Sequence, residues 1–143
     1  MKDRIIGCIL GGAIGDAIGA PLEGERDFDK LFDKFGPQGV HEFTSAFSPF
    51  DNKFLKIGDT TDDTASIVAT VAAIVKFKEA ERKKEFLHYL WQAHIIWGSN
   101  QEGGDRLSSF IETDIDWAPW FKPFFSSTGA GRGTIAALSQ GRM

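Results

Sequence analysis

The sequence Gly58-Asp59-Thr60-Thr61-Asp62-Asp63-Thr64 runs directly into an apolar stretch over residues 65–75. The composition and length of residues 64–80 predict a buried helix that begins here. Two adjacent carboxylates and a hydroxyl therefore stand where a loop becomes a helix, and two interpretations are open. Thr and Asp side chains are favoured at helix N-termini, where they accept backbone N–H bonds. The same hard oxygens are also the ligands that Mg²⁺, Mn²⁺ or Ca²⁺ select.

The composition is typical of one soluble domain over residues 1–143. The chain has 143 residues with 42% hydrophobic content, and a chain of this size buries roughly 68% of its unfolded surface. The net charge is −4 and the 16 Lys and Arg residues are scattered, which disfavours a nucleic-acid partner. A single cysteine, Cys8, forms no internal disulfide. We expect it to be a small buried residue in a reducing cytoplasm.

Four glycines recur at every fourth position near the N-terminus: Gly7, Gly11, Gly15 and Gly19. On a helix this spacing places them along one face. Each glycine costs a helix about 1 kcal/mol relative to alanine. The stripe therefore predicts a helix that packs closely against another element.

A membrane span is not expected in the same stretch. Lys2 and Arg4 precede the apolar residues 5–10, which faintly resembles a signal sequence. However, Asp16 interrupts the apolar stretch before the roughly 20 residues that a span requires.

The rest of the chain is predicted to be mostly helical, giving an all-α fold with long irregular loops. Residues 81–97 place Phe86, Leu90, Ala93 and Trp97 at helical spacings of three and four. A shorter helical pattern covers residues 134–138. Glycine and proline signals predict irregular chain over 28–57 and 99–133, and loops of this length usually carry function.

Three motifs carry a family resemblance. They are Gly7-Cys8-Ile9-Leu10-Gly11-Gly12-Ala13-Ile14-Gly15-Asp16-Ala17-Ile18-Gly19-Ala20-Pro21-Leu22-Glu23, Thr61-Asp62-Asp63-Thr64 and Gly129-Ala130-Gly131-Arg132-Gly133-Thr134. In this order they resemble the ADP-ribosylglycohydrolase family. The resemblance implies an all-helical, magnesium-dependent hydrolase that removes ADP-ribose from modified targets. The family also includes a lens crystallin that is similar to the enzymes.

The resemblance assigns roles to several residues. It implies that Thr61, Asp62 and Asp63 ligate a pair of Mg²⁺ ions, or Mn²⁺, and that Glu23 is catalytic beside the scissile bond. The implied partner is ADP-ribose or an ADP-ribosylated protein. Its neighbours alone favour the interpretation of Glu23 as a solvated loop residue.

The third motif suggests a phosphate site. Gly129, Gly131, Arg132 and Gly133 lie just before a predicted helix, where backbone N–H groups and the arginine charge favour a diphosphate. A flexible turn is the alternative interpretation. Upstream lies an aromatic group made of Trp117, Trp120, Phe121, Phe124 and Phe125. We expect most of it to be core, although an adenine ring could stack on one member.

The resemblance covers nearly all of this chain but only about half of the family fold. The family's second ligand motif, Asp-x-Asp-Thr, does not occur in this sequence. Two divalent ions bring four positive charges, whereas Asp62 and Asp63 supply two negative ones. We therefore expect an incomplete domain. It would be either an enzyme completed by further chain, a second chain or self-association, or a non-catalytic ADP-ribose-binding or structural protein.

Overall fold

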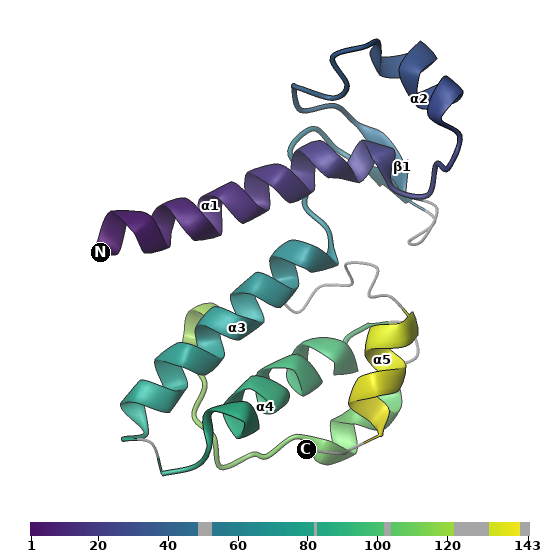
Figure 1. Ribbon diagram of the computed structural model, residues 1–143. Coiled ribbons are helices and arrows are strands. Elements are labelled where there is room, and N and C mark those ends of the chain that lie inside the picture. The colour runs from purple at the N-terminus through teal and green to yellow at the C-terminus, as the bar shows by residue number, and fades with distance from the viewer. Residues whose placement is uncertain (49–52, 82, 102–103, 122–131, 141–143) are drawn as a thin grey trace. The chain divides into compact units, whose positions relative to one another are not determined.

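The computed structural model describes residues 1–48, 53–81, 83–101, 104–121 and 132–140 (Figure 1). The chain divides into two compact units, residues 1–64 and 65–143. Both are built mainly from helices, and the strands described form one two-stranded sheet. The prediction of an all-α fold is therefore confirmed, with a small hairpin added.

The first unit begins with helix α1 (Lys2–Gly19), which continues into the short 3-10 helix η1 (Ala20–Leu22). Helix α2 (Phe28–Phe35) follows. The Asp27 carboxylate accepts the backbone N–H groups of Asp29 and Lys30 at the start of α2, and Gly36 ends the helix with φ 72°. The prediction of an irregular chain from residue 28 was wrong here, because these two capping residues define a helix of only eight residues.

A hairpin completes the first unit. Strands β1 (Ala46–Ser48) and β2 (Lys53–Leu55) pair antiparallel, with Ala46 opposite Leu55. The rings of Phe47 and Phe54 meet edge to face across the pair, 5.2 Å apart. Ala46 and Leu55 are buried and η1 packs against β1. The hairpin thus forms the small core of this unit together with the end of α1.

No described residue of the first unit packs against the glycine stripe of α1. A Cβ atom added at Gly7, Gly11, Gly15 or Gly19 would meet no atom within 4 Å. The expectation of close packing on this face is not met there, and Cys8, expected to be buried, is exposed.

The segment Lys2–Leu22 is long and apolar enough to cross a membrane by length and composition, although these criteria alone are weak. The sequence argument that Asp16 shortens it too far therefore does not hold. Asp16 instead takes part in hydrogen bonds with the chain around Thr61, as described below. Such bonds are typical of a helix inside a folded unit, and the absence of a span stays a prediction.

The second unit contains most of helix α3 (Asp62–Glu79), helix α4 (Phe86–Ser99), the 3-10 helix η2 (Asp105–Phe110) and helix α5 (Arg132–Ser139). The helices predicted over 64–80, 81–97 and 134–138 are confirmed with shifted ends. Helix α4 begins at Phe86 rather than at residue 81, because the chain turns at Glu81, whose φ is 52°.

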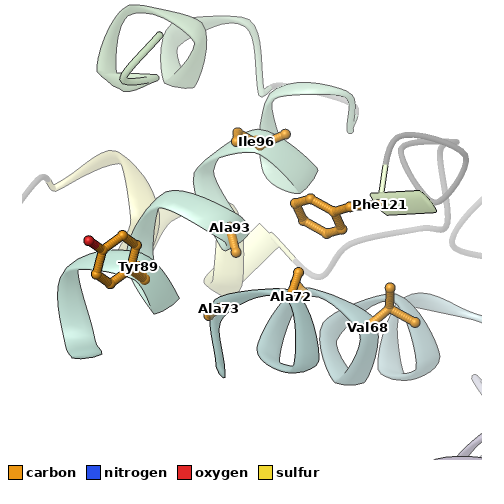
Figure 2. Close-up of a cluster of buried hydrophobic side chains, with 8 residues drawn as sticks. Val68, Ala72, Ala73, Tyr89, Ala93, Ile96 and Phe121 are labelled. Atoms are coloured by element: carbon orange, nitrogen blue, oxygen red, sulfur yellow. The ribbon is translucent and has the colours of Figure 1, made fainter. Parts of the chain in front are cut away.

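Helices α3 and α4 both contribute side chains to the core of the second unit. Alanines on both helices are buried, and Phe121 lies beside Ile96 of α4 and above Val68 and Ala72 of α3 (Figure 2). The cluster consists of Val68, Ala69, Ala72, Ala73, Tyr89, Ala93, Ile96 and Phe121. The buried Gln92 amide donates to the Phe110 carbonyl and accepts the Glu112 N–H, both at 2.9 Å. It thereby ties the chain after η2 to α4.

Candidate functional site

The Asp16 carboxylate lies at the centre of a hydrogen-bond group in the first unit. One oxygen, Oδ2, accepts the backbone N–H groups of Thr61 (2.9 Å) and Thr64 (3.0 Å) and the Thr64 hydroxyl (2.5 Å). The other, Oδ1, accepts the Thr61 hydroxyl at 2.7 Å. Asp16 therefore links the end of α1 to the start of α3.

This arrangement bears on the choice between a helix cap and a ligand at Thr61. A capping threonine would use its hydroxyl to accept a backbone N–H two or three residues later. Here the Thr64 N–H goes to Asp16, and the Thr61 hydroxyl acts as a donor. Asp16, which is not part of α3, thus accepts the N–H that a capping residue would accept. The hydroxyl of Thr61 donates to Asp16.

Glu23 follows η1 and lies close to Thr61. Its N–H donates to the Ala20 carbonyl at 3.2 Å, which fixes the turn that presents its half-buried side chain. The Glu23 carboxylate is 3.5 Å from the Thr61 hydroxyl oxygen. Burial raises the pKa of Glu23, and the negative charges of Asp16, Asp62 and Asp63 raise this pKa further. Glu23 is therefore half-buried near three other carboxylates, and its catalytic role stays a prediction.

Asp62 and Asp63 occupy the first turn of α3. Asp62 is half-buried and Asp63 is exposed. Carboxylates are favoured in a first turn because the helix dipole is positive there. Thr61, Asp62, Asp63 and Glu23 thus lie near the same helix end, and all of their side chains carry oxygen.

The donor chemistry at this helix end fits Mg²⁺, because every side chain in the group offers oxygen. The fit is partial. Among the residues that the structure describes, no three His, Cys, Asp or Glu side chains already converge on one point. A cation here would complete its coordination with the Thr61 hydroxyl, water and ligands from elsewhere.

The predicted phosphate site is only partly described. Gly129 and Gly131 lie outside the described residues, as does the side chain of Arg132. Helix α5 begins at Arg132, two residues earlier than the sequence suggested, and Gly133 is exposed in its first turn. The role of this motif stays a prediction.

Comparison with known proteins decides the family. The sequence matches the family model described as ADP-ribosylglycohydrolase over residues 1–142. The chain belongs to the ADP-ribosylglycohydrolase family. No curated protein and no solved structure matched the chain.

Sequence reasoning missed the part that Asp16 plays in this group of hydrogen bonds. Asp16 was treated as an interruption of an apolar stretch and as one letter of the first motif. The available signal was its isolation, since no other charged residue occurs over 5–22. A lone carboxylate in an apolar helix requires partners, because an unpaired charge is costly away from water.

The described members of the aromatic group over residues 117–125 are divided between core and surface. Phe121 is buried in the second unit and its ring lies 5.3 Å from that of Trp117, while Trp120 is 43% exposed. Phe124 and Phe125 lie outside the described residues. The expectation that the group contributes to the core is confirmed for Phe121.

Proposed function

We propose that this chain carries the first part of a magnesium-dependent site that hydrolyses the glycosidic bond between ADP-ribose and a modified target, such as an ADP-ribosylated protein. Thr61, Asp62 and Asp63 would bind Mg²⁺, or Mn²⁺ in its place. Glu23 would act as the general acid and base. The observation that supports the proposal is the gathering of Glu23 with Thr61 and the first-turn carboxylates of α3, in a chain of this family.

The proposed reaction transfers the ADP-ribosyl group to water. The oxygen of water bonds to the anomeric carbon, the bond from that carbon to the target breaks, and the target leaves with the bonding electrons and takes up a proton. The anomeric carbon becomes positively charged as the bond breaks, and nearby carboxylates stabilise that charge.

Glu23 suits the proton transfer in this reaction. Burial and neighbouring negative charges raise the pKa of this carboxyl group, which makes it a better proton acceptor than an ordinary glutamate. Asp62 and Asp63 lie in the first turn of α3, and their carboxylates would hold the cation there. When bound there, Mg²⁺ would neutralise negative charge and orient the ribose hydroxyls.

The test is calorimetric titration of ADP-ribose into the full chain, with Mg²⁺ and again with a chelator, for wild type and Asp62→Ala. We expect binding that needs Mg²⁺ and is lost in the variant. Asp59→Asn is the matched control, because it removes an exposed charge from the same loop. Asparagine also keeps a side-chain oxygen that can accept the Lys56 N–H, which donates to Asp59 Oδ2 at 2.8 Å. Equal Mg²⁺ dependence in Asp62→Ala and wild type would overturn the metal assignment.

An assay for released ADP-ribose, with ADP-ribosylated protein as substrate, then separates hydrolysis from binding. Glu23→Gln is the informative variant here. It should retain Mg²⁺-dependent binding and lose hydrolysis, because the amide of glutamine cannot act as a general acid or base.

A second candidate function is non-catalytic binding of ADP-ribose, or a structural role. This candidate comes from the sequence, because residues 1–143 contain no Asp-x-Asp-Thr string. Tight binding without release of ADP-ribose from any substrate, even when a second chain or added partner is supplied, would favour this candidate.

A further inference from the structure

We propose that Asp16 is a positioning residue that orients the hydroxyl of Thr61 so that its lone pairs are available to a divalent cation. The inference rests on the proposed function, because it concerns the same site. It is carried by the four hydrogen bonds that the Asp16 carboxylate accepts from Thr61 and Thr64.

The first step concerns the single proton of the Thr61 hydroxyl. A hydroxyl has one O–H donor and two acceptor lone pairs. The Thr61 oxygen lies 2.7 Å from Asp16 Oδ1 and 3.5 Å from the nearer oxygen of Glu23. The shorter contact takes the proton, because a charge-assisted O–H bond at this distance is strong and one at 3.5 Å is not. The O–H of Thr61 therefore points at Asp16, and the two lone pairs of its oxygen point in other directions.

The second step concerns what fixes Asp16 itself. Its Oδ2 atom is held by two backbone N–H groups and the Thr64 hydroxyl, all at 3.0 Å or less. These donors leave the carboxylate little freedom to rotate. Its Oδ1 atom therefore stays directed at Thr61, and an outer partner that fixes a ligand in this way is typical of metal sites.

The third step is the consequence of replacing Asp16 with its amide. In Asp16→Asn the three donors that meet at Oδ2 require the remaining carbonyl oxygen at that place. The amide NH₂ then faces Thr61 and donates to its hydroxyl oxygen. The Thr61 hydroxyl becomes an acceptor of this bond, and its proton turns away from residue 16. One lone pair is then used by the amide and is no longer available to a cation. The shape and most hydrogen bonds of the group are kept.

The experiment measures Mn²⁺ binding to the full chain by electron paramagnetic resonance of the free ion, with far-UV circular dichroism to confirm folding. The variants are Asp16→Asn, Thr61→Val and the double variant. We expect each single variant to bind Mn²⁺ about 10- to 100-fold more weakly, the range found for partners that orient metal ligands. The double variant should bind about as weakly as Thr61→Val alone, because both changes act through one hydroxyl.

Thr64→Val is the matched control. It also removes a hydroxyl that Asp16 accepts, but it leaves the Thr61 hydroxyl in place. A purely structural role for Asp16 predicts that Thr64→Val weakens Mn²⁺ binding as much as Asp16→Asn, and that the effects of Asp16→Asn and Thr61→Val add. We expect neither result, and either one would overturn the inference.

Three further outcomes also decide the inference. If Asp16→Asn fails to fold, Thr61→Val still tests the inference, since unchanged Mn²⁺ affinity in that variant would refute it. If wild type binds no Mn²⁺, the metal site of the proposed function fails, and the role of Asp16 fails with it. Binding by wild type with equal binding by Asp16→Asn refutes the positioning role alone.

Discussion

The Asp16 carboxylate accepts both the backbone N–H and the hydroxyl of Thr61, at 2.9 and 2.7 Å, although 45 residues separate the two in the sequence. One side chain of α1 thus satisfies the polar groups at the start of α3. Because Thr61 is buried, the loss of this acceptor would leave its donors without a partner, which is more costly than the loss of a bond at the surface.

Asp16→Ala should therefore destabilise the first unit. We expect a loss of about 2 kcal/mol in the free energy of unfolding, comparable to the loss of a strong helix cap and a charged hydrogen bond. Urea unfolding followed by circular dichroism measures the total, and hydrogen exchange of the Thr61 and Thr64 amides reports the local effect. Asp3→Ala, an exposed carboxylate of the same helix, is the control. Unchanged exchange at both amides would contradict the hydrogen bonds described.

Glu23→Gln should stabilise the metal-free protein at neutral pH. Burial and the charges of Asp16, Asp62 and Asp63 raise the pKa of Glu23 above its ordinary value of 4.5. The folded state therefore holds this proton more tightly than the unfolded state does. Ionisation of Glu23 thus lowers the free energy of unfolding as pH rises from 4.5 through the folded pKa.

The measurement is the urea midpoint of wild type and Glu23→Gln across this pH range, in chelator. We expect the variant to gain less than about 1 kcal/mol at neutral pH, because solvent screens a half-buried charge, and to lose the advantage in acid. Glu42→Gln, which removes an exposed glutamate charge, should show no such pH dependence. A Glu23→Gln variant less stable than wild type at neutral pH would contradict the carboxylate repulsion.

The sequence was informative where structure depends on neighbouring residues. The apolar run before Lys76 and the spacing of Phe86, Leu90 and Ala93 predicted α3 and α4, because helical periodicity is local. Helix α2 was missed because its two ends depend on capping by Asp27 and Gly36, which resemble turn residues in the sequence alone.

The candidate site could be predicted only in part. The family motifs indicated Glu23, Thr61, Asp62 and Asp63, and the structure places these residues together. The bonds of Asp16 could not be predicted, because nothing local shows which distant donors a lone carboxylate meets. The glycine stripe gave the opposite lesson. Its spacing predicted close packing, but no described residue of the first unit packs against that face.

Gly104→Ala should destabilise the second unit. A Cβ atom at Gly104 would stand 1.9 Å from the carbonyl oxygen of Gly98 at the end of α4. Because the obstacle is backbone, the chain must move, and overpacking of this kind costs about 1–3 kcal/mol. Urea unfolding followed by tryptophan fluorescence measures this loss, since all four tryptophans lie in the second unit.

Gly133→Ala provides the control for Gly104→Ala. A Cβ atom there meets nothing within 4 Å, and the residue lies in α5. Alanine in a helix is favoured over glycine by up to about 1 kcal/mol, so this variant should be at least as stable as wild type. Equal stability of Gly104→Ala and Gly133→Ala would contradict the close approach of Gly104 to α4.

Glu112→Gln should reduce the acid sensitivity of the second unit. Glu112 accepts a hydrogen bond from Lys84 and lies 3.2 Å from His88 Nε2. The Lys84 hydrogen bond is the main cause that lowers the pKa of Glu112 below its ordinary value of 4.5. A lowered pKa in the folded state means that ionised Glu112 contributes stability above pH 4.5, and this stability is lost as pH falls through the folded pKa.

We therefore expect the urea midpoint of wild type to fall more steeply than that of Glu112→Gln between neutral pH and about pH 3. The difference should be no more than about 1 kcal/mol, because the Lys84–Glu112 pair is partly exposed to solvent. Lys84→Gln should reproduce it, since the same hydrogen bond is removed from the other side. Glu85→Gln, an exposed glutamate at the start of α4, should follow wild type. Parallel acid profiles for wild type, Glu112→Gln and Lys84→Gln would show that this pair contributes nothing to the folded state.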